Sequence, residues 1–374
     1  CSGAAYPQNL PRPAGLETEI GFWRRVFTEV TSNEALIHDE RHLGVVYGKV
    51  DLPDSSSRRS IYAHTLAHYR NLLLELAEGE HAELSEEQQR LLALWPATNS
   101  QQALKQQLTQ AAARLRMQRG LSDRFRDGIS RSGQWRDYIR QQLREAGVPE
   151  ELAALPHVES SFNPRAESHV GAVGLWQFTR TTGKRFMRVD HIVDERRDPF
   201  RASRAAAQLL QYNYSILGSW PLAITAYNHG LAGMRRAVRT QESEDITNIV
   251  KNYSGRAFGF ASRNFYVSLL AAVEVEQNAD KYFAVLDPLS PPQDTLFEIP
   301  AYVPVSALES SLGVSREQLQ SHNPSLKSSV WSGSKRVPEG YHMRLPSALV
   351  GEDFQQRLAA IPAQQQFAFQ KPDL

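Results

Sequence analysis

The chain has 374 residues, enough for two or more domains that each bury a hydrophobic core. Lysine and arginine total 42 against 41 acidic residues, so the chain lacks the basic excess that nucleic-acid-binding proteins carry. Hydrophobic residues make up 41% of the chain, and no apolar run approaches the roughly 20 residues that span a bilayer. The composition indicates a globular chain and is compatible with a neutral carbohydrate or a zwitterionic ligand.

The single cysteine is the first residue, Cys1. One cysteine excludes an intrachain disulfide and a cysteine-based metal site, and we predict no metal or other cofactor. An N-terminal cysteine is typical of bacterial lipoproteins, whose lipid chains hold the protein on a membrane; the alternative is an arbitrary start of the sequence. As a lipoprotein, the chain would use residues 1–15, with three prolines and two glycines, as a tether. Ser2 favours the outer membrane, with the protein in the periplasm.

Residues 16–122 are predicted to form a helical N-terminal region, because apolar residues recur at helical spacing in four segments. These segments are 22–30, 61–79, 85–95 and 101–120. Ser85 with Gln88 three residues later is a capping-box signal. The segment 42–60 is expected to hold a short strand or hairpin. Nothing in this region indicates a specific chemistry.

Helical patterns with glycine- and asparagine-rich loops continue over 123–286, which we predict to be one domain. Asp198 and Pro199 open an alanine-rich helix, as cap and first residue. A proline-rich linker over 287–295 separates this domain from a compact unit over 296–349. The glutamine-rich tail, 350–374, is predicted to be a peripheral helix or a loose end.

Glu159 is an acidic residue on what is predicted to be an apolar helix face. In VPEELAALPHVESSF, Leu152, Leu155, Glu159 and Phe162 are spaced to share one side of a helix. Burial would disfavour the charged carboxylate and raise its pKa above about 4.3. A carboxylic acid that keeps its proton at neutral pH is what general-acid cleavage of a glycosidic bond requires. A buried glutamate paired with an arginine is the equal alternative.

The residues after Glu159 favour a functional role for it. Ser160 lies beside the glutamate and could hold it or a sugar substituent by a hydrogen bond. In HVGAVGLWQF, the glycines allow a tight turn and a close approach of the backbone to a ligand. Trp176 and Phe178 offer flat apolar faces suited to sugar rings, and Gln177 offers a donor and an acceptor.

A second cluster follows in WPLAITAYNHGLAGM, which reads as an apolar helix that ends at Gly230. Tyr227 and Asn228 would then project at a helix end, where pockets form. The tyrosine hydroxyl could bond to the glutamate, or Tyr227 could be a half-buried core residue.

Three motifs in this order, ES at 159–160, GLWQF at 174–178 and AYN at 226–228, resemble the signature of lytic transglycosylases. These are soluble-lytic-type relatives of goose-type lysozyme that cut peptidoglycan, and LPHVESSFNPRAESHVGAVGLWQF with VDERRDPF is most similar to the membrane-bound D type. The resemblance covers roughly 123–283. It implies a mainly α fold with a lysozyme-like catalytic domain.

The resemblance also implies site residues. Glu159 would be the sole catalytic acid/base; it would protonate the oxygen between N-acetylmuramic acid and N-acetylglucosamine and assist closure of a 1,6-anhydro ring. Ser160 and Gln177 would contact sugar substituents. Tyr227 would orient Glu159, with Asn228 in support, and Tyr266 falls on the helix that closes such clefts. The partner would be the peptidoglycan glycan strand.

Ordinary glycosidases use two carboxylates, and VDERRDP supplies Asp194, Glu195 and Asp198 as candidates. Because Arg196 and Arg197 are interleaved with them, a structural ion-pair cluster is the favoured interpretation. A second carboxylate facing Glu159 would favour a hydrolytic muramidase instead. A non-catalytic peptidoglycan-binding scaffold is the third hypothesis.

The segment 296–349 resembles a LysM module, a small βααβ carbohydrate-binding unit. The resemblance rests on a helix over 305–311, on GVS followed by REQL, on His322-Asn323-Pro324 and on the ending VPEGYHMRLP. Its first strand departs from the family pattern because it carries two prolines. The family binds N-acetylglucosamine stretches of peptidoglycan; a module that only packs on the catalytic part is the alternative.

Overall fold

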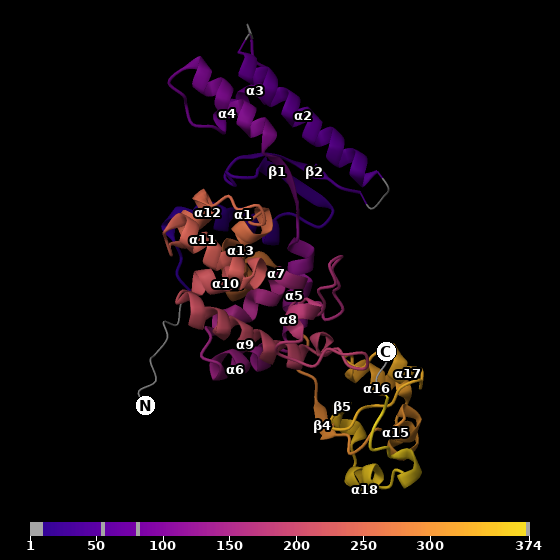
Figure 1. Cartoon of the computed structure of the whole chain (residues 1–374). Helices are drawn as coiled ribbons and strands as arrows, with labels where there is room; N and C mark the ends of the chain where they lie inside the picture. Colours follow the sequence, from indigo (N-terminus) through magenta and orange to yellow (C-terminus); the bar gives the residue numbers. More distant parts are fainter. Residues whose placement is uncertain (1–9, 54–56, 80–82, 372–374) are drawn as a thin grey trace. The chain divides into compact units, whose positions relative to one another are not determined.

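The computed structural model describes residues 10–53, 57–79 and 83–371, which hold 18 α-helices and five short strands (Figure 1). Contacts divide the chain into two compact units, each made of two stretches of sequence. Unit 1 is Cys1–Ile129 with Leu210–Leu286, and unit 2 is Ser130–Leu209 with Asp287–Leu374. Helices dominate both units, so the predicted mainly α class is confirmed.

Cys1 lies outside the described residues, and its lipidation stays a prediction. The described end of the predicted tether is attached to unit 1: Leu10 is buried, and Arg12 forms ion pairs with Glu17 at 2.7 Å and Glu274 at 2.8 Å. Among the described residues, no helix has both the length and the apolar character needed to cross a membrane.

Unit 1 contains a small sheet and two groups of helices. The N-terminal elements are η1 (Ala14–Leu16), α1 (Glu17–Thr28), β1 (Glu34–Asp39), β2 (Val46–Asp51), α2 (Arg58–Glu78), α3 (Glu86–Ala93), α4 (Gln101–Ala113), β3 (Leu115–Arg119) and α5 (Ser122–Ser132), the last crossing into unit 2. The later elements are the end of α9 (Pro199–Leu217), α10 (Trp220–His229), α11 (Leu231–Gln241), α12 (Ile246–Asn252), α13 (Phe260–Gln277) and α14 (Ala279–Tyr282). Helix α1 packs against α13, and α2 packs against α4 (Figure 1).

The sheet has the order β2–β1–β3, with both pairs antiparallel. The strand expected in 42–60 is confirmed as β2. The helix predicted over 101–120 is wrong at its end, because α4 stops at Ala113 and Leu115–Arg119 pairs with β1. Met117 is buried between polar neighbours, and this alternation suits a strand that covers a core on one side. The capping box at Ser85 and Gln88 is confirmed.

Unit 2 contains α6 (Arg136–Glu145), η2 (Glu150–Ala154), α7 (Leu155–Ser160), α8 (Arg180–Gly183), η3 (Glu195–Arg197) and the start of α9, which begins at Pro199 as predicted. Its C-terminal part contains β4 (Asp294–Glu298), α15 (Val305–Leu312), α16 (Arg316–His322), α17 (Ser328–Trp331), β5 (His342–Pro346), η4 (Ser347–Leu349), α18 (Phe354–Ala359) and η5 (Ala363–Gln365). The predicted domain 123–286 therefore contributes to both units, whereas the unit over 296–349 shares unit 2 with 130–209.

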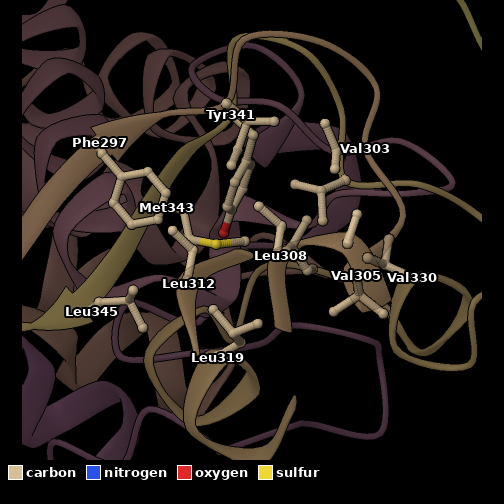
Figure 2. Close-up of a cluster of buried hydrophobic side chains, with 14 of the residues drawn as sticks. Phe297, Val303, Val305, Leu308, Leu312, Leu319, Val330, Tyr341, Met343 and Leu345 are labelled. Atoms are coloured by element: carbon tan, nitrogen blue, oxygen red, sulfur yellow. The ribbon is translucent and has the colours of Figure 1, made fainter. Parts of the chain in front are cut away.

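The C-terminal part has the predicted two strands and two helices with a further short helix, α17, before the last strand, and β4 pairs antiparallel with β5. Strand β4 ends before the first of the two prolines, at Glu298, and Gly340 makes the predicted turn with φ of 73°. Figure 2 shows the apolar side chains of α15, α16 and both strands meeting in one cluster. Phe354 of the tail joins this cluster, so α18 belongs to the core. Membership of the LysM family stays a prediction.

Two residues from the segment before η3 belong to the same core. Ile192 and Val193 lie in the cluster with the C-terminal side chains, and Val193 is fully buried. Backbone hydrogen bonds reinforce this contact: Asp194 N donates to Ser325 O at 2.7 Å, and Lys327 N donates to Ile192 O at 3.0 Å. The C-terminal part is therefore packed onto the 188–198 segment.

Val193→Asp should destabilise unit 2, because it places a carboxylate in this shared core. We expect the free energy of unfolding, measured by urea denaturation, to fall by more than about 3 kcal/mol. Val170→Asp is the matched control, since Val170 is 82% exposed and should be nearly neutral. Equal stability of the two variants would contradict the shared core.

Candidate active site

Glu159 lies in the last turn of the short helix α7. The single helix predicted over 148–162 is divided, because residues Glu150–Ala154 form a 3-10 helix before α7 begins. Leu152, Leu155 and Phe162 are fully buried, as the spacing predicted. The chain leaves the helix through Ser161 and Phe162, whose φ values of 51° and 54° are left-handed. Such conformations are costly for residues with a side chain and here end the helix directly after the site.

The carboxyl group of Glu159 is partly shielded from water and has no charged partner. The side chain is half-buried, and among the described residues it forms no hydrogen bond and no ion pair. Burial raises the pKa of Glu159 to about 8. The alternative of a glutamate paired with an arginine is therefore wrong, and the carboxyl group carries its proton at neutral pH.

Ser160 fixes the end of α7 to the glycine-containing loop over 171–178. Its hydroxyl donates to Leu175 O at 2.8 Å and lies 3.3 Å from Pro156 O. Arg131 donates to the carbonyl oxygen of Ser161 at 2.7 Å, from the end of α5. These bonds set the position of Glu159 relative to the loop.

The loop turns at three left-handed residues. Gly171 and Gly174 have φ values of 74° and 80°, and Gln177 has 47°. The glycines were predicted to let the backbone approach a ligand. At Gly174 the backbone instead approaches another part of the protein, because a Cβ there would lie 2.1 Å from Arg196 O. The glycine is required for packing of the loop against η3.

Gln177 is half-buried, and its amide nitrogen is used within the loop. It donates to Gly174 O at 2.9 Å and to Ala166 O at 3.3 Å. The amide oxygen forms no hydrogen bond among the residues that the structure describes. A contact from Gln177 to a sugar would therefore use this oxygen as an acceptor.

The aromatic residues of the loop are core residues, contrary to prediction. Trp176 is fully buried, and its indole nitrogen donates to Ser203 Oγ at 2.8 Å. Phe178 is 2% exposed. Neither ring offers a face to a sugar, so their assignment as substrate-binding residues is wrong. The hydrogen bond of Trp176 attaches the loop to α9.

Arg196 holds the other side of the loop. Its guanidinium donates to Gly171 O and Phe178 O, both at 3.0 Å, and pairs with Asp194 through two hydrogen bonds of 2.8 and 2.7 Å. Both members of the pair are buried. The sequence showed Arg196 only as part of a charge cluster; that it fastens the loop depends on contacts between distant residues.

The three candidate second carboxylates have structural partners. Asp194 is held by Arg196, and the ion pair lowers the pKa of Asp194 against the effect of burial. Glu195 accepts a hydrogen bond from Arg188 N at 2.7 Å, and Asp198 caps α9 through Phe200 N at 2.8 Å. The predicted ion-pair cluster is confirmed for Asp194.

Three further predicted site residues, Tyr227, Asn228 and Tyr266, lie in unit 1. Tyr227 is half-buried at the end of α10, where its ring stacks on Phe265 with centroids 6.4 Å apart. Asn228 accepts a hydrogen bond from Ser262 at 2.8 Å, and Gly230 ends α10 with φ of 84° as predicted. The roles of Tyr227 and Asn228 toward a substrate stay predictions.

Tyr266 has a structural role that argues against its predicted contact with substrate. The ring is fully buried in α13, and the hydroxyl donates to the carbonyl oxygen of Pro11. Burial raises the pKa of this hydroxyl. Tyr266 therefore attaches the N-terminal segment to α13 within unit 1, and its assignment as a substrate-binding residue is wrong.

Comparison with known proteins covers the segment that holds Glu159, the loop and Tyr227. Residues 137–250 match the family model described as Transglycosylase SLT domain. The match confirms the resemblance of this SLT segment to lytic transglycosylases.

Two curated proteins similar to this chain are named as lytic transglycosylases. Two proteins named membrane-bound lytic murein transglycosylase D, from Escherichia coli strains K12 and O6:H1, are each 26% identical over 201 residues, which is 53% of this chain. The chain spans only 44% of the length of these curated relatives. Among solved structures, the 70 kDa soluble lytic transglycosylase of Escherichia coli has 22% identity and a TM-score of 0.35, over 59% of this chain and 35% of that chain.

Asp194→Asn should destabilise the loop, because it leaves the buried Arg196 without its counter-charge. We expect a loss of about 3–5 kcal/mol in the free energy of unfolding, measured by urea denaturation. Glu167→Gln is the control: Glu167 pairs with Arg197 at the surface, and its loss should cost at most about 1 kcal/mol. Similar losses in both variants would argue against a special role of the buried pair.

Glu159 should make stability depend on pH in a defined direction. Its folded-state pKa of about 8 lies above the ordinary value of 4.5, so the folded protein binds the extra proton between these values. Its contribution is fully present below pH 4.5 and is lost as the pH rises toward 8. Relative to Glu159→Gln, the unaltered protein should lose about 1.4 kcal/mol per pH unit in this window. Urea unfolding at pH 5, 6 and 7 measures the difference, and a constant difference would contradict the raised pKa.

Proposed function

We propose that the protein is a lytic transglycosylase that cleaves the β-1,4 bond between N-acetylmuramic acid and N-acetylglucosamine in peptidoglycan. The products would carry 1,6-anhydromuramoyl ends. The match of residues 137–250 to the transglycosylase SLT domain supports this activity, as do the names of the relatives. The observation that carries the proposal is Glu159, whose carboxyl group has no charged partner among the described residues and whose pKa is raised to about 8 by burial.

The proposed reaction uses one carboxyl group twice. Protonated Glu159 donates its proton to the glycosidic oxygen as the bond from C1 to that oxygen breaks, and the N-acetylglucosamine side leaves as an alcohol. The resulting carboxylate then takes the proton from the C6 hydroxyl of the muramoyl residue, whose oxygen bonds to C1. Glu159 ends protonated again, and no water is consumed.

The other residues around Glu159 would position it and the substrate. The hydrogen bond from Ser160 to Leu175 O supports a positioning role for Ser160. Gln177 would accept a hydrogen bond from a sugar amide or hydroxyl through its amide oxygen.

Hydrolysis by a muramidase is the alternative, and it requires a second carboxylate to activate water. Asp194, Glu195 and Asp198 are bound by an arginine or by backbone nitrogens. Their engagement favours the anhydro-forming reaction. A non-catalytic scaffold is disfavoured, because Glu159 is buried enough to raise its pKa and yet forms no hydrogen bond or ion pair among the described residues that would give it a structural role.

We further propose a location in the cell envelope, where peptidoglycan lies. The name of the two relatives, membrane-bound lytic murein transglycosylase, supports this location. Within the envelope, the proposed location is the periplasm, at the outer membrane.

Glu159→Gln should abolish digestion of purified peptidoglycan. The glutamine cannot transfer a proton, so we expect a rate loss of at least about 10²–10⁴-fold. Mass spectrometry of the products from the unaltered protein should show muramoyl ends lighter by one water than those made by a hydrolase. The matched control is Glu151→Gln, because Glu151 is also half-buried and burial raises its pKa. This control should retain activity.

Two results would contradict the proposal. Unchanged digestion by Glu159→Gln would exclude Glu159 as the acid, and reducing muramoyl ends would establish hydrolysis. Circular dichroism of the variant would show that a lost activity does not reflect a lost fold.

A further inference from the structure

Unit 1 contains a cavity of about 580 Å³ that lies mostly outside the SLT segment. This volume is in the range typical of small-ligand sites. The wall comes from α1, from the loop after β1, from the end of α12 and from α13. Among the described residues, the charged side chains of the wall that form no ion pair are Glu19, Glu40, Arg41, Lys251 and Arg263, which we call the charged cavity set.

Arg263 is a buried cation that forms no salt bridge with an acid among the described residues, although the charge of Glu40 acts on it. It is 9% exposed, and its guanidinium donates to Val250 O, to Tyr253 O at 3.1 Å and to Phe258 O at 3.4 Å. Burial and the positive charge of Arg41 lower the pKa of Arg263 to about 10, and the negative charge of Glu40 partly opposes this shift. A buried charge that contacts only neutral acceptors is unfavourable, and an anionic group in the cavity would relieve this cost.

The loop that carries Arg41 is fixed before any ligand arrives. Buried Asp39 accepts hydrogen bonds from the backbone nitrogens of Arg41 at 2.8 Å and His42 at 2.9 Å. Asp39 also pairs with Arg114 at 3.0 Å, so the charge of this further lining residue is already neutralised. The Arg41 guanidinium donates to Lys251 O at 2.8 Å, which joins the loop to α12. A rigid rim of this kind lowers the entropic cost of binding.

Two acidic side chains face the same cavity. Glu19 has one carboxylate oxygen shielded from solvent without a hydrogen-bond partner. Glu40 forms no side-chain hydrogen bond and no ion pair among the described residues. The cavity thus holds acids and cations that form no salt bridge with each other among the described residues. A ligand that carries only negative or only positive charge would pair either with the cations or with the acids of the cavity, but not with both.

We propose that the charged cavity set binds a zwitterionic peptide, with its carboxylate at Arg41, Lys251 and Arg263 and its ammonium group at Glu19 and Glu40. The assignment of a source for this ligand rests on the proposed function: the ligand is the peptide stem of peptidoglycan. Binding of the stem would hold the wall polymer through its peptide as well as its glycan.

Isothermal titration calorimetry of the full chain tests this proposal with the synthetic tetrapeptide Ala-γ-Glu-diaminopimelate-Ala. We expect saturable binding that weakens about tenfold in Arg41→Gln and in Lys251→Gln. The same peptide with its amino groups acetylated should also bind about tenfold more weakly, because the acids of the cavity lose their partner. Arg126→Gln is the matched control, since Arg126 lies exposed at the surface of unit 1 and outside the cavity.

Absence of binding would overturn the proposal. Equal binding of the acetylated peptide, or competition by inorganic phosphate at similar concentration, would make the cavity a simple anion site and overturn it as well. Glu159→Gln should bind the tetrapeptide normally. Binding without any digestion of peptidoglycan by the unaltered protein would refute the proposed function and leave the zwitterion site in place.

Discussion

The chemistry proposed for this protein depends on the cost of removing a carboxyl group from water without giving it a charged partner. At Glu159 that cost keeps the proton on the acid at neutral pH. The surrounding structure maintains this state by geometry. The chain leaves α7 in a left-handed conformation directly after Ser160, and the Ser160 hydroxyl ties the helix end to the following loop.

A buried charge in the neighbouring segment has its own partners. Arg196 is bound by Asp194 and by two carbonyl oxygens of the loop. This pair fastens the loop, and the raised pKa of Glu159 has burial as its cause. In unit 1 the charged cavity set differs, because its acids and cations line one cavity and form no salt bridge with each other among the described residues.

Local signals in the sequence predicted local structure well. The capping box at Ser85, the start of α9 at Pro199 and the end of α10 at Gly230 were all predicted, because each depends on a few neighbouring residues. The spacing around Glu159 also identified its apolar neighbours. Sequence spacing shows which residues share a face, but it does not show what covers that face. For this reason the sequence predicts sugar contacts for Trp176 and Phe178, and the resemblance implies one for Tyr266, although the fold buries all three. Strand β3 was missed for the same reason, since its pairing with β1 joins residues about 80 positions apart.

The core shared by Val193 and the C-terminal part has a consequence for how this chain can evolve. Small domains are often regarded as independent units that recombination can move between proteins. Here the segment over 188–198 supplies side chains and backbone hydrogen bonds to the C-terminal part, so a transplanted copy of that part would lack some of its interior. The two stretches must therefore be inherited together, and substitutions in one should be matched by changes in the other.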